Sequence, residues 1–234
     1  LGVSAVIPMV QLAIDCVSDE PGIALAVDGV AAVVATWETQ RNHSVELLPN
    51  IERMLVEAGR TKGDIEAVFV DLGPGGYAAL RVGVSIAKAI AHGLGVPIVG
   101  VGRLEIDAFA VARDAGNRRI VGLHRAGKGE VAWAAYRLPP PQEAWREEIA
   151  PRITKVDALH AAITTGDVVT GDIEDALADA MAVAGASAAS PHGHRVVALA
   201  ALGQQRLVEG RADDPTTLVP LYLRAPAIGP QKQA

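Results

Sequence analysis

The sequence holds few residues of several kinds, and each shortage excludes a class of protein. It has one cysteine, Cys16, so no disulfide can form within the chain, which fits a reducing cytoplasm. Aromatic residues make up only 3%, so Ala, Val, Leu and Ile must build the core, as in layered α/β proteins. Acidic residues outnumber basic ones, giving a net charge of −6. Because autonomous nucleic-acid binding usually requires a basic surface, we expect any contact with RNA to be indirect.

Long apolar runs are also missing. No segment reaches about 18 consecutive apolar residues, so we expect no membrane contact through a spanning helix. The start, Leu1 to Val10, is apolar but lacks a basic stretch, so we expect no signal peptide, and we give the residues before Met9 no weight. Half of the 234 residues are hydrophobic, which predicts a folded protein of one large or two small domains.

Three apolar runs open the N-terminal part of the chain. They are Val10–Asp15, Gly22–Val27 and Val30–Trp37, and Asp28-Gly29 separates the last two. Asp-Gly between apolar runs is the strongest short hairpin signal, so the second and third runs are predicted to pair antiparallel. A periodic apolar face then predicts a helix over Ser44–Ala58.

Strands and helices alternate further along. The pattern predicts strands over Ala67–Asp71 and Val96–Val101, and helices over Tyr77–Leu94 and Leu104–Ala115. A similar, shorter pattern recurs from about Asn117. It predicts strands over Arg119–Leu123, Glu130–Arg137 and Asp167–Thr170, and helices over Ile153–Ile163, Ile173–Met181 and Arg195–Glu209.

This order predicts the fold class. An antiparallel hairpin followed by crossover helices indicates mixed sheets with helices packed on them. We therefore predict an α/β fold of the actin-like ATPase or ribonuclease-H-like kind, with two related subdomains. Residues 9–115 would form the first and residues 116–224 the second, with the helix near 195–209 a candidate to pack back on the first. Residues 225–234 would be a mobile tail.

The helix predicted over Tyr77–Leu94 has little polar surface. Its polar residues form one narrow stripe, which leaves roughly 280° of the circumference apolar or tiny at about 100° per residue. A helix that packs only on a sheet needs a narrower apolar stripe. Two interpretations follow: the helix is wholly buried within its own domain, or another chain covers one flank.

The second interpretation gives a candidate partner interface on two helices. A row of small residues would let a second helix approach closely, and a neighbouring row is apolar. The candidate residues are Leu47, Ile51, Leu55, Ala79, Val82, Gly83, Ile86, Ala87 and Ile90.

A glycine-rich loop raises the question of phosphate binding. Gly73, Gly75 and Gly76 lie between a strand and a helix, and Asp15 at the end of the first strand could hold magnesium for ATP. Asp71 would repel phosphate, however, and neither Cys16 nor Gly76 offers a hydroxyl. A tight turn is the simpler interpretation.

We find no catalytic or metal site in the residue pattern. His43 at a helix start is expected to be a cap or a surface residue, since residue 47 is Leu. His192 and His194 lie in a loop with no cysteine partner, and Cys16 has no evident base.

Several runs in one order nevertheless resemble those of a known family. The runs are Leu12-Ala13-Ile14-Asp15, His43-Ser44-Val45-Glu46-Leu47-Leu48-Pro49, Gly73-Pro74-Gly75, Leu80-Arg81-Val82-Gly83 with Ala87-Lys88, Gly95-Val96-Pro97-Ile98-Val99-Gly100-Val101, Lys128-Gly129-Glu130-Val131 and Pro220-Leu221-Tyr222-Leu223-Arg224. The ordered set is similar to the TsaB (YeaZ) family over nearly the whole chain.

The resemblance implies a function. It implies a non-catalytic subunit that dimerises with a catalytic paralogue, TsaD, through the two helices named above. Together with the ATPase TsaE, the complex would transfer a threonylcarbamoyl group to the adenosine beside the tRNA anticodon. It also implies a homodimer when the subunit is alone. The paralogue carries a His-x-x-x-His metal pair, and the matching positions here are Arg103 and Asp107. Because arginine does not give up its proton to bind a metal, these positions indicate an inactive partner.

The sequence departs from the family pattern at three places. Cys16 replaces a Thr, Gly76-Tyr77-Ala78-Ala79 replaces Ser-Phe-Thr-Gly, and His124-Arg125-Ala126 replaces Asp-Ala-Arg. These changes remove hydroxyls and an acid. Two alternatives stay open: a small ATPase or kinase that uses Asp15 and the glycine loop, and a metallopeptidase.

Overall fold

The computed structural model describes residues 9–17, 20–39, 42–127, 129–138, 145–172, 185–190 and 193–224. Its first sheet has the order β3-β2-β1-β4-β5. The strands are β1 (Val10–Asp15), β2 (Gly22–Val27), β3 (Val30–Thr36), β4 (Ala67–Asp71) and β5 (Ile98–Val101). The first three pair antiparallel, and β4 and β5 join parallel to β1. The predicted hairpin is confirmed: Asp28 and Gly29 have φ values of 49° and 80°, as a two-residue turn with positive φ requires.

The second sheet repeats this topology. Its strands are β6 (Arg119–Gly127), β7 (Glu130–Arg137), β8 (Arg146–Lys155), β9 (Val168–Gly171) and β10 (Ser187–Ala188). Their order is β10-β9-β6-β7-β8, with an antiparallel β6-β7-β8 meander and β9 and β10 parallel to β6. The repeat confirms the predicted actin-like, ribonuclease-H-like fold with two related halves.

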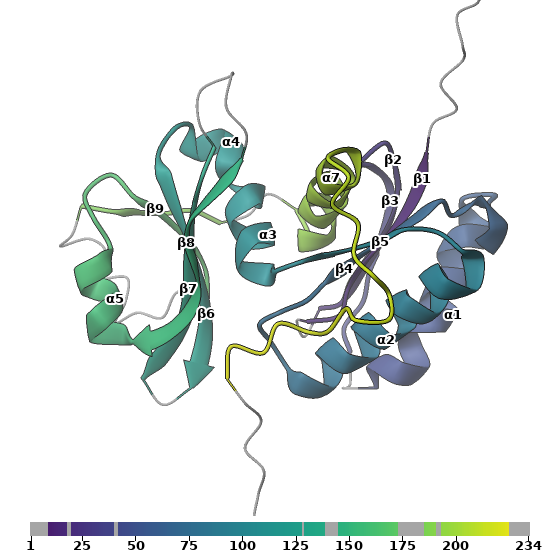
Figure 1. The fold of residues 1–234 in the computed structure, drawn as a ribbon, viewed down its shortest axis with the longest axis horizontal. Coiled ribbons are helices and arrows are strands. Elements are labelled where there is room, and N and C mark those ends of the chain that lie inside the picture. The colour runs from purple at the N-terminus through teal and green to yellow at the C-terminus, as the bar shows by residue number, and fades with distance from the viewer. Residues whose placement is uncertain are drawn as a thin grey trace, which may run out of the picture.

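Helices cover both sheets (Figure 1). The helices are α1 (His43–Glu57), α2 (Tyr77–Leu94), α3 (Arg103–Ala110), α4 (Ala112–Ala115), α5 (Val156–Ala162) and α7 (Arg195–Val208), and a 3-10 turn spans Lys62–Asp64. Helices α1 and α2 pack on one face of the first sheet, and α7 packs on the other. Helices α3 and α4 pack on the second sheet, and α5 covers its opposite face. Helix α3 also contacts α7, so it joins the two halves. Among the described residues, no helix is both long and apolar enough to cross a membrane.

Alternation along β1 explains the two layers around the first sheet. Leu12 and Ile14 pack toward α1 and α2, whereas Ala13 packs toward α7. Small residues on the second face let α7 come close. A Cβ at Gly203 of α7 would lie only 2.3 Å from the ring of Phe69 in β4, so any side chain there would force the ring or the helix to move.

Two sequence predictions of helices need correction. The helix predicted over Ile153–Ile163 begins only at Val156, because Ile153 to Lys155 complete strand β8. That strand was missed because its outward residues are charged, as is common on an edge strand. The helix predicted over Leu104–Ala115 is two helices that break at Val111. The helix predicted over Ile173–Met181 and the tail 225–234 lie outside the described residues.

Candidate functional site

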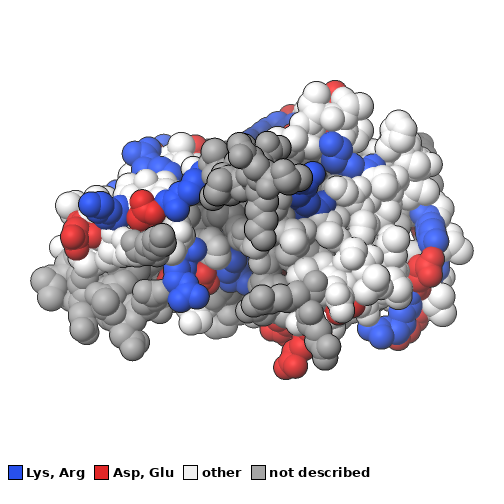
Figure 2. Space-filling model, turned by 90° about the horizontal axis from the view of Figure 1, so that it is seen from below, with Lys and Arg blue, Asp and Glu red and all other residues white. Residues whose placement is uncertain are grey.

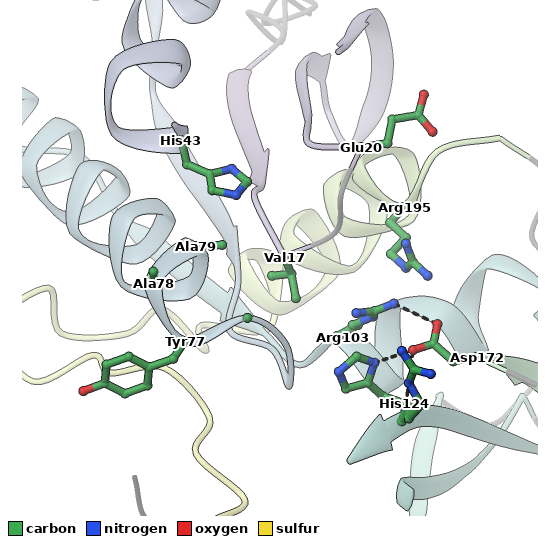
Figure 3. A pocket seen from close by; sticks show the side chains of 12 residues that line it. Val17, Glu20, His43, Tyr77, Ala78, Ala79, Arg103, His124, Asp172 and Arg195 are labelled. Atoms are coloured by element: carbon green, nitrogen blue, oxygen red, sulfur yellow. Dashed lines mark hydrogen bonds and ion pairs between the residues drawn. The ribbon is translucent and has the colours of Figure 1, made fainter. Parts of the chain in front are cut away.

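A cavity of about 720 Å³ lies between the two halves, and the first residues of four helices line it. These residues are His43 of α1, Tyr77 of α2, Arg103 of α3 and Arg195 of α7. The fold explains the arrangement, since α1, α2 and α3 each follow the carboxyl end of a strand of the first sheet. Figure 3 shows the ring of His43 reaching into the cavity from one side and a cluster of charged side chains on the other.

The charged cluster is a network of ion pairs. Arg103 is nearly buried, and it lies 3.6 Å from Asp107 on its own helix and 3.2 Å from Asp172 after β9. Asp107 also pairs with Arg195, and Asp172 lies 2.6 Å from Nδ1 of His124. The network therefore ties α3, α7 and the second sheet together at the cavity wall.

Two further carboxyl groups lie buried behind this wall. Asp15 accepts a hydrogen bond from the Val17 N–H at 2.9 Å, and Asp71 accepts one from the Gly73 N–H at 2.7 Å. The second carboxyl oxygen of each has no partner among the described residues. Burial and the nearby Asp15 raise the pKa of Asp71 well above its ordinary value, although the Gly73 hydrogen bond opposes this.

The pKa values of the two acids in this network are shifted in opposite directions. Burial raises the pKa of Asp107, although Arg195 and Arg103 act against it, and the same ion pair raises the pKa of Arg195 despite burial. Burial also acts to raise the pKa of Asp172. The hydrogen bond to His124 and the charge of Arg103 outweigh it, so the pKa of Asp172 lies below its ordinary value.

The metal that the family resemblance implies for a catalytic paralogue does not fit these residues. The matching positions hold Arg103 and Asp107, whose side chains are 5% and 0% exposed and face each other. The guanidinium is a permanent cation and excludes a second one. Within the part of the chain that the structure describes, no three His, Cys, Asp or Glu side chains group as metal ligands.

Of the four residues that the sequence suggested for nucleotide binding, only one lines the cavity. Gly76 lines it, whereas Asp15 and Gly73 are buried. Gly75 packs against the chain, because a Cβ there would lie 2.1 Å from Val17. The loop is thus a tight turn held against β1.

The interface candidates divide into two groups. Six of them are buried in the core of the chain itself: Leu47, Ile51, Leu55, Ala79, Gly83 and Ala87. The row of small residues faces the chain's own sheet and not another helix, since a Cβ at Gly83 would lie 3.2 Å from Cys16. Val82, Ile86 and Ile90 are partly exposed.

The C-terminal segment covers another part of α2. Leu218 is buried in the same core as α1 and α2, and Lys88 donates a hydrogen bond to its carbonyl at 2.9 Å. Much of the apolar surface of α2 is therefore buried by its own chain.

Sequence reasoning missed several residues of the cavity. His43 was expected to be a cap or a surface residue, but it is buried and lines the cavity. Arg195 and Asp172 carried no local signal, because each is one charged residue at the end of an element. Only the topology brings them beside Arg103.

Comparison with known proteins gives the family. Residues 33–160 match the family model TsaD: tRNA N6-adenosine threonylcarbamoyltransferase. The tRNA threonylcarbamoyladenosine biosynthesis protein TsaB of Escherichia coli (strain K12) is 32% identical over 150 residues, 64% of each chain. An uncharacterized protein of Mycobacterium tuberculosis (strain ATCC 25618 / H37Rv) is 32% identical over 197 residues, which cover 81% of this chain and 79% of that protein.

The fold has a solved counterpart. The structure of YeaZ from Pseudomonas aeruginosa aligns with a TM-score of 0.71 at 22% identity, covering 92% of this chain and 100% of that one. The match to the E. coli relative spans less than two thirds of its length, at 64%. The chain therefore belongs to the TsaB (YeaZ) family, and with it to the wider family of the threonylcarbamoyltransferase TsaD.

Proposed function

We propose that this chain takes part in tRNA threonylcarbamoyladenosine biosynthesis as a subunit without a catalytic centre of its own. In this proposal it dimerises in the cytoplasm with the catalytic paralogue TsaD, which transfers the threonylcarbamoyl group to the adenosine beside the anticodon. TsaE would join as the ATPase of the ternary complex. The subunit would form a homodimer when alone and reach tRNA only through the complex.

The observation that carries this proposal is the ion pair at the cavity wall. A transferase centre of the kind the resemblance implies needs a divalent metal, and here a buried guanidinium lies at that position. Arg103 is held between Asp107 and Asp172. Moving it out would leave Asp107 with Arg195 and Asp172 with His124, so each carboxylate would lose one ionic partner, at a cost of about 1–3 kcal/mol. The site is built to stay closed to a metal, which favours a structural role for this half of the complex.

The surface available for a partner is the outer side of α1 and α2. Val45, Leu48 and Val56 of α1 are 66%, 47% and 77% exposed, and together with Ile90 and Leu94 of α2 they form what we call the α1–α2 face. A mainly apolar cavity of about 340 Å³ lies between the two helices. Seen from below in Figure 2, the right-hand surface, where these helices lie, is a broad uncharged area with charged residues at its rim.

Such a surface fits a protein partner. Isolated exposed apolar residues are common, but several of them on two neighbouring helices beside an apolar cavity favour an interaction site. Helix pairs usually associate through rows of this kind. The candidate residues buried beneath, Leu47 and Ile51, would support the face and not touch the partner.

The test uses TsaD from the same organism. Leu48→Glu and Val56→Glu should each weaken the complex at least about tenfold, because a charge would be buried against apolar surface. The measurement is sedimentation velocity with a dilution series of the two proteins. Complex formation unchanged in both variants would contradict the proposed surface.

Val208→Glu is the matched control. Val208 is 76% exposed, close to the 77% of Val56, and it lies at the end of α7 on the opposite side of the first sheet. It should leave the affinity for TsaD unchanged.

Activity provides the second part of the test. With TsaE, ATP, tRNA and a threonylcarbamoyl donor, product should form only when TsaD is present. Threonylcarbamoyladenosine made by this chain without TsaD would overturn the non-catalytic assignment.

A further inference from the structure

The cavity between the halves is surrounded by helix N-termini. Helices α1, α2, α3 and α7 contain 15, 18, 8 and 14 residues, and all four begin at its wall. The N-terminus of a helix carries roughly half a positive charge and N–H groups that lack partners within the helix. Four such ends around one space favour a negatively charged group there.

Among the described residues, no side chain caps α1, α2 or α3. Helix α2 differs from the other two because its first turn holds no acid, whereas α1 has Glu46 there and α3 has Glu105. The cavity-lining residues at the start of α2, Gly76 to Ala79, carry neither a carboxylate nor an aliphatic hydroxyl. Helix α7 differs, because the His194 side chain accepts a hydrogen bond from the Val196 N–H at 3.1 Å. The first turn of α2 is thus the natural place for an external acceptor.

His43 is an independent sign of a ligand. Its side chain is only 9% exposed, yet Nδ1 has no hydrogen-bond partner among the described residues. A buried polar nitrogen without a partner is costly, so such groups are normally paired. Figure 3 shows the ring directed into the cavity near Ala79 at the start of α2.

The other side chains limit the charge of the ligand. Three arginines, Arg103, Arg125 and Arg195, line the cavity, and the first and third already pair with Asp107. Two acids, Glu20 and Asp172, line it as well, and Asp15 and Asp71 lie buried behind. This surplus of carboxyl groups disfavours a ligand with several negative charges, such as a polyphosphate.

We propose that this cavity binds the carboxylate group of a small ligand, with the first-turn N–H groups of α2 as donors and His43 beside them. The proposal does not depend on TsaD or on the α1–α2 face, and it can be tested on the isolated chain.

The test titrates acetate, inorganic phosphate and magnesium-ATP into the ¹⁵N-labelled protein, with chloride holding the ionic strength constant. Acetate should give saturable shifts of the Tyr77, Ala78 and Ala79 amide signals and of the His43 ring, with one common dissociation constant. Phosphate and magnesium-ATP should bind more weakly than acetate. Shifts that do not saturate, or tighter binding of either phosphate compound, would overturn the proposal.

An isosteric pair of variants separates binding from folding. Ala78 is exposed in the first turn of α2, where Asp favours the helix, so Ala78→Asp should fold and place its own carboxylate in the site. We expect it to weaken acetate binding at least about tenfold, whereas Ala78→Asn should stay within about threefold of the wild type. Equal affinities of the two variants would refute the site.

A second pair of variants tests the role of His43. His43→Gln should weaken acetate binding, and His92→Gln, at the exposed last turn of α2, should not. Thermal unfolding of each variant in chloride shows whether the fold is kept. A folded His43→Gln protein with wild-type affinity would remove His43 from the site.

Discussion

The two halves of the molecule each place an acid at the end of the equivalent strand, but the surroundings shift the pKa values of these two acids in opposite directions. Asp71 ends β4 of the first sheet, and Asp172 follows β9, the strand that takes the same position in the second sheet. Asp71 is buried near Asp15 with one oxygen unpaired, and its pKa is raised. Asp172 is paired with Arg103 and His124, and its pKa is lowered.

The difference shows that a repeated topology sets the position of a carboxyl group but not its protonation. The strand order places a carboxylate at the carboxyl edge of each sheet, facing the space between the halves. The neighbours decide its charge. In the first half the charged group with the largest effect on the pKa of Asp71 is a second acid, Asp15, whereas in the second half Arg103 of α3 forms an ion pair with Asp172.

The largest change in the free energy of unfolding should come from replacing Asp107, the acid that pairs with arginines of both α3 and α7. Asp107 is fully buried and pairs with both Arg103 and Arg195. Asp107→Ala would remove both the counter-ion and the hydrogen-bond acceptor of Arg195 and would take one carboxylate from Arg103, so we expect it to lower the free energy of unfolding by about 3–5 kcal/mol, measured by urea denaturation. Asp157→Ala, at an exposed acid of α5, should change it by less than about 0.5 kcal/mol. Equal effects of the two would mean that the network does not hold the halves together.

Close packing of helices on the two sheets provides a second comparison. A Cβ at Gly122 of β6 would lie 2.4 Å from the backbone oxygen of Leu104, whereas a Cβ at Gly203 of α7 would meet the Phe69 ring at 2.3 Å. A ring can shift more easily than a backbone carbonyl. Gly122→Ala should therefore cost about 2–3 kcal/mol and Gly203→Ala about 1 kcal/mol, since alanine also favours the helix.

Gly93 is the control for these glycine variants. A Cβ there would meet none of the described atoms within 4 Å, so Gly93→Ala should stabilise the protein by about 0.5–1 kcal/mol. Thermal unfolding of the three variants gives the ranking. A larger cost for Gly203→Ala than for Gly122→Ala would reverse the comparison.

The last comparison concerns Asp71 and Asp172 themselves. Replacing each by Asn should change the free energy of unfolding in opposite directions. Because the folded state raises the pKa of Asp71, this group favours folding below the unfolded-state pKa of about 3.9 and loses that contribution as the pH rises through the folded pKa. Asp71→Asn should hence stabilise the protein at pH 7 relative to the wild type, and the difference should vanish in acid.

Asp172 should behave in the opposite way. Its lowered pKa means that its contribution is present above about pH 3.9 and is lost as the pH falls through the folded pKa. Asp172→Asn should destabilise by about 1 kcal/mol at pH 7, a modest value because the side chain is 36% exposed, and by less in acid. Urea denaturation between pH 3 and pH 7 measures both. The same sign for both variants would show that the two acids are not distinguished.

Local patterns predicted much of the fold. Asp28-Gly29 predicted its hairpin, and the recurrence of the pattern after Asn117 predicted two related halves. The edge strand β8 was missed because a solvated strand with charged outward residues gives little apolar signal. The break at Val111 was missed because the apolar periodicity continues across it.

Burial of individual residues near the candidate interface was harder to predict from the sequence than the secondary structure. The sequence marked α2 as unusually apolar and α1 as amphipathic, but it could not tell which apolar residues of the two helices their own sheet would bury. Leu47 and Ala87 are 0% exposed, while Leu48, one residue from Leu47, is 47% exposed. That distinction depends on the angle at which each helix lies on the sheet.

The sequence by itself determined most of the strands and helices, the hairpin turn and the family to which the chain belongs, because each depends on neighbouring residues or on an ordered set of short motifs. Only the tertiary structure decided that His43, Tyr77, Arg103 and Arg195 surround one cavity. These residues lie far apart in the chain and share no pattern. They meet because the sheet topology directs the starts of four helices to one edge, and the charges brought together there then set the protonation of the acids beside them.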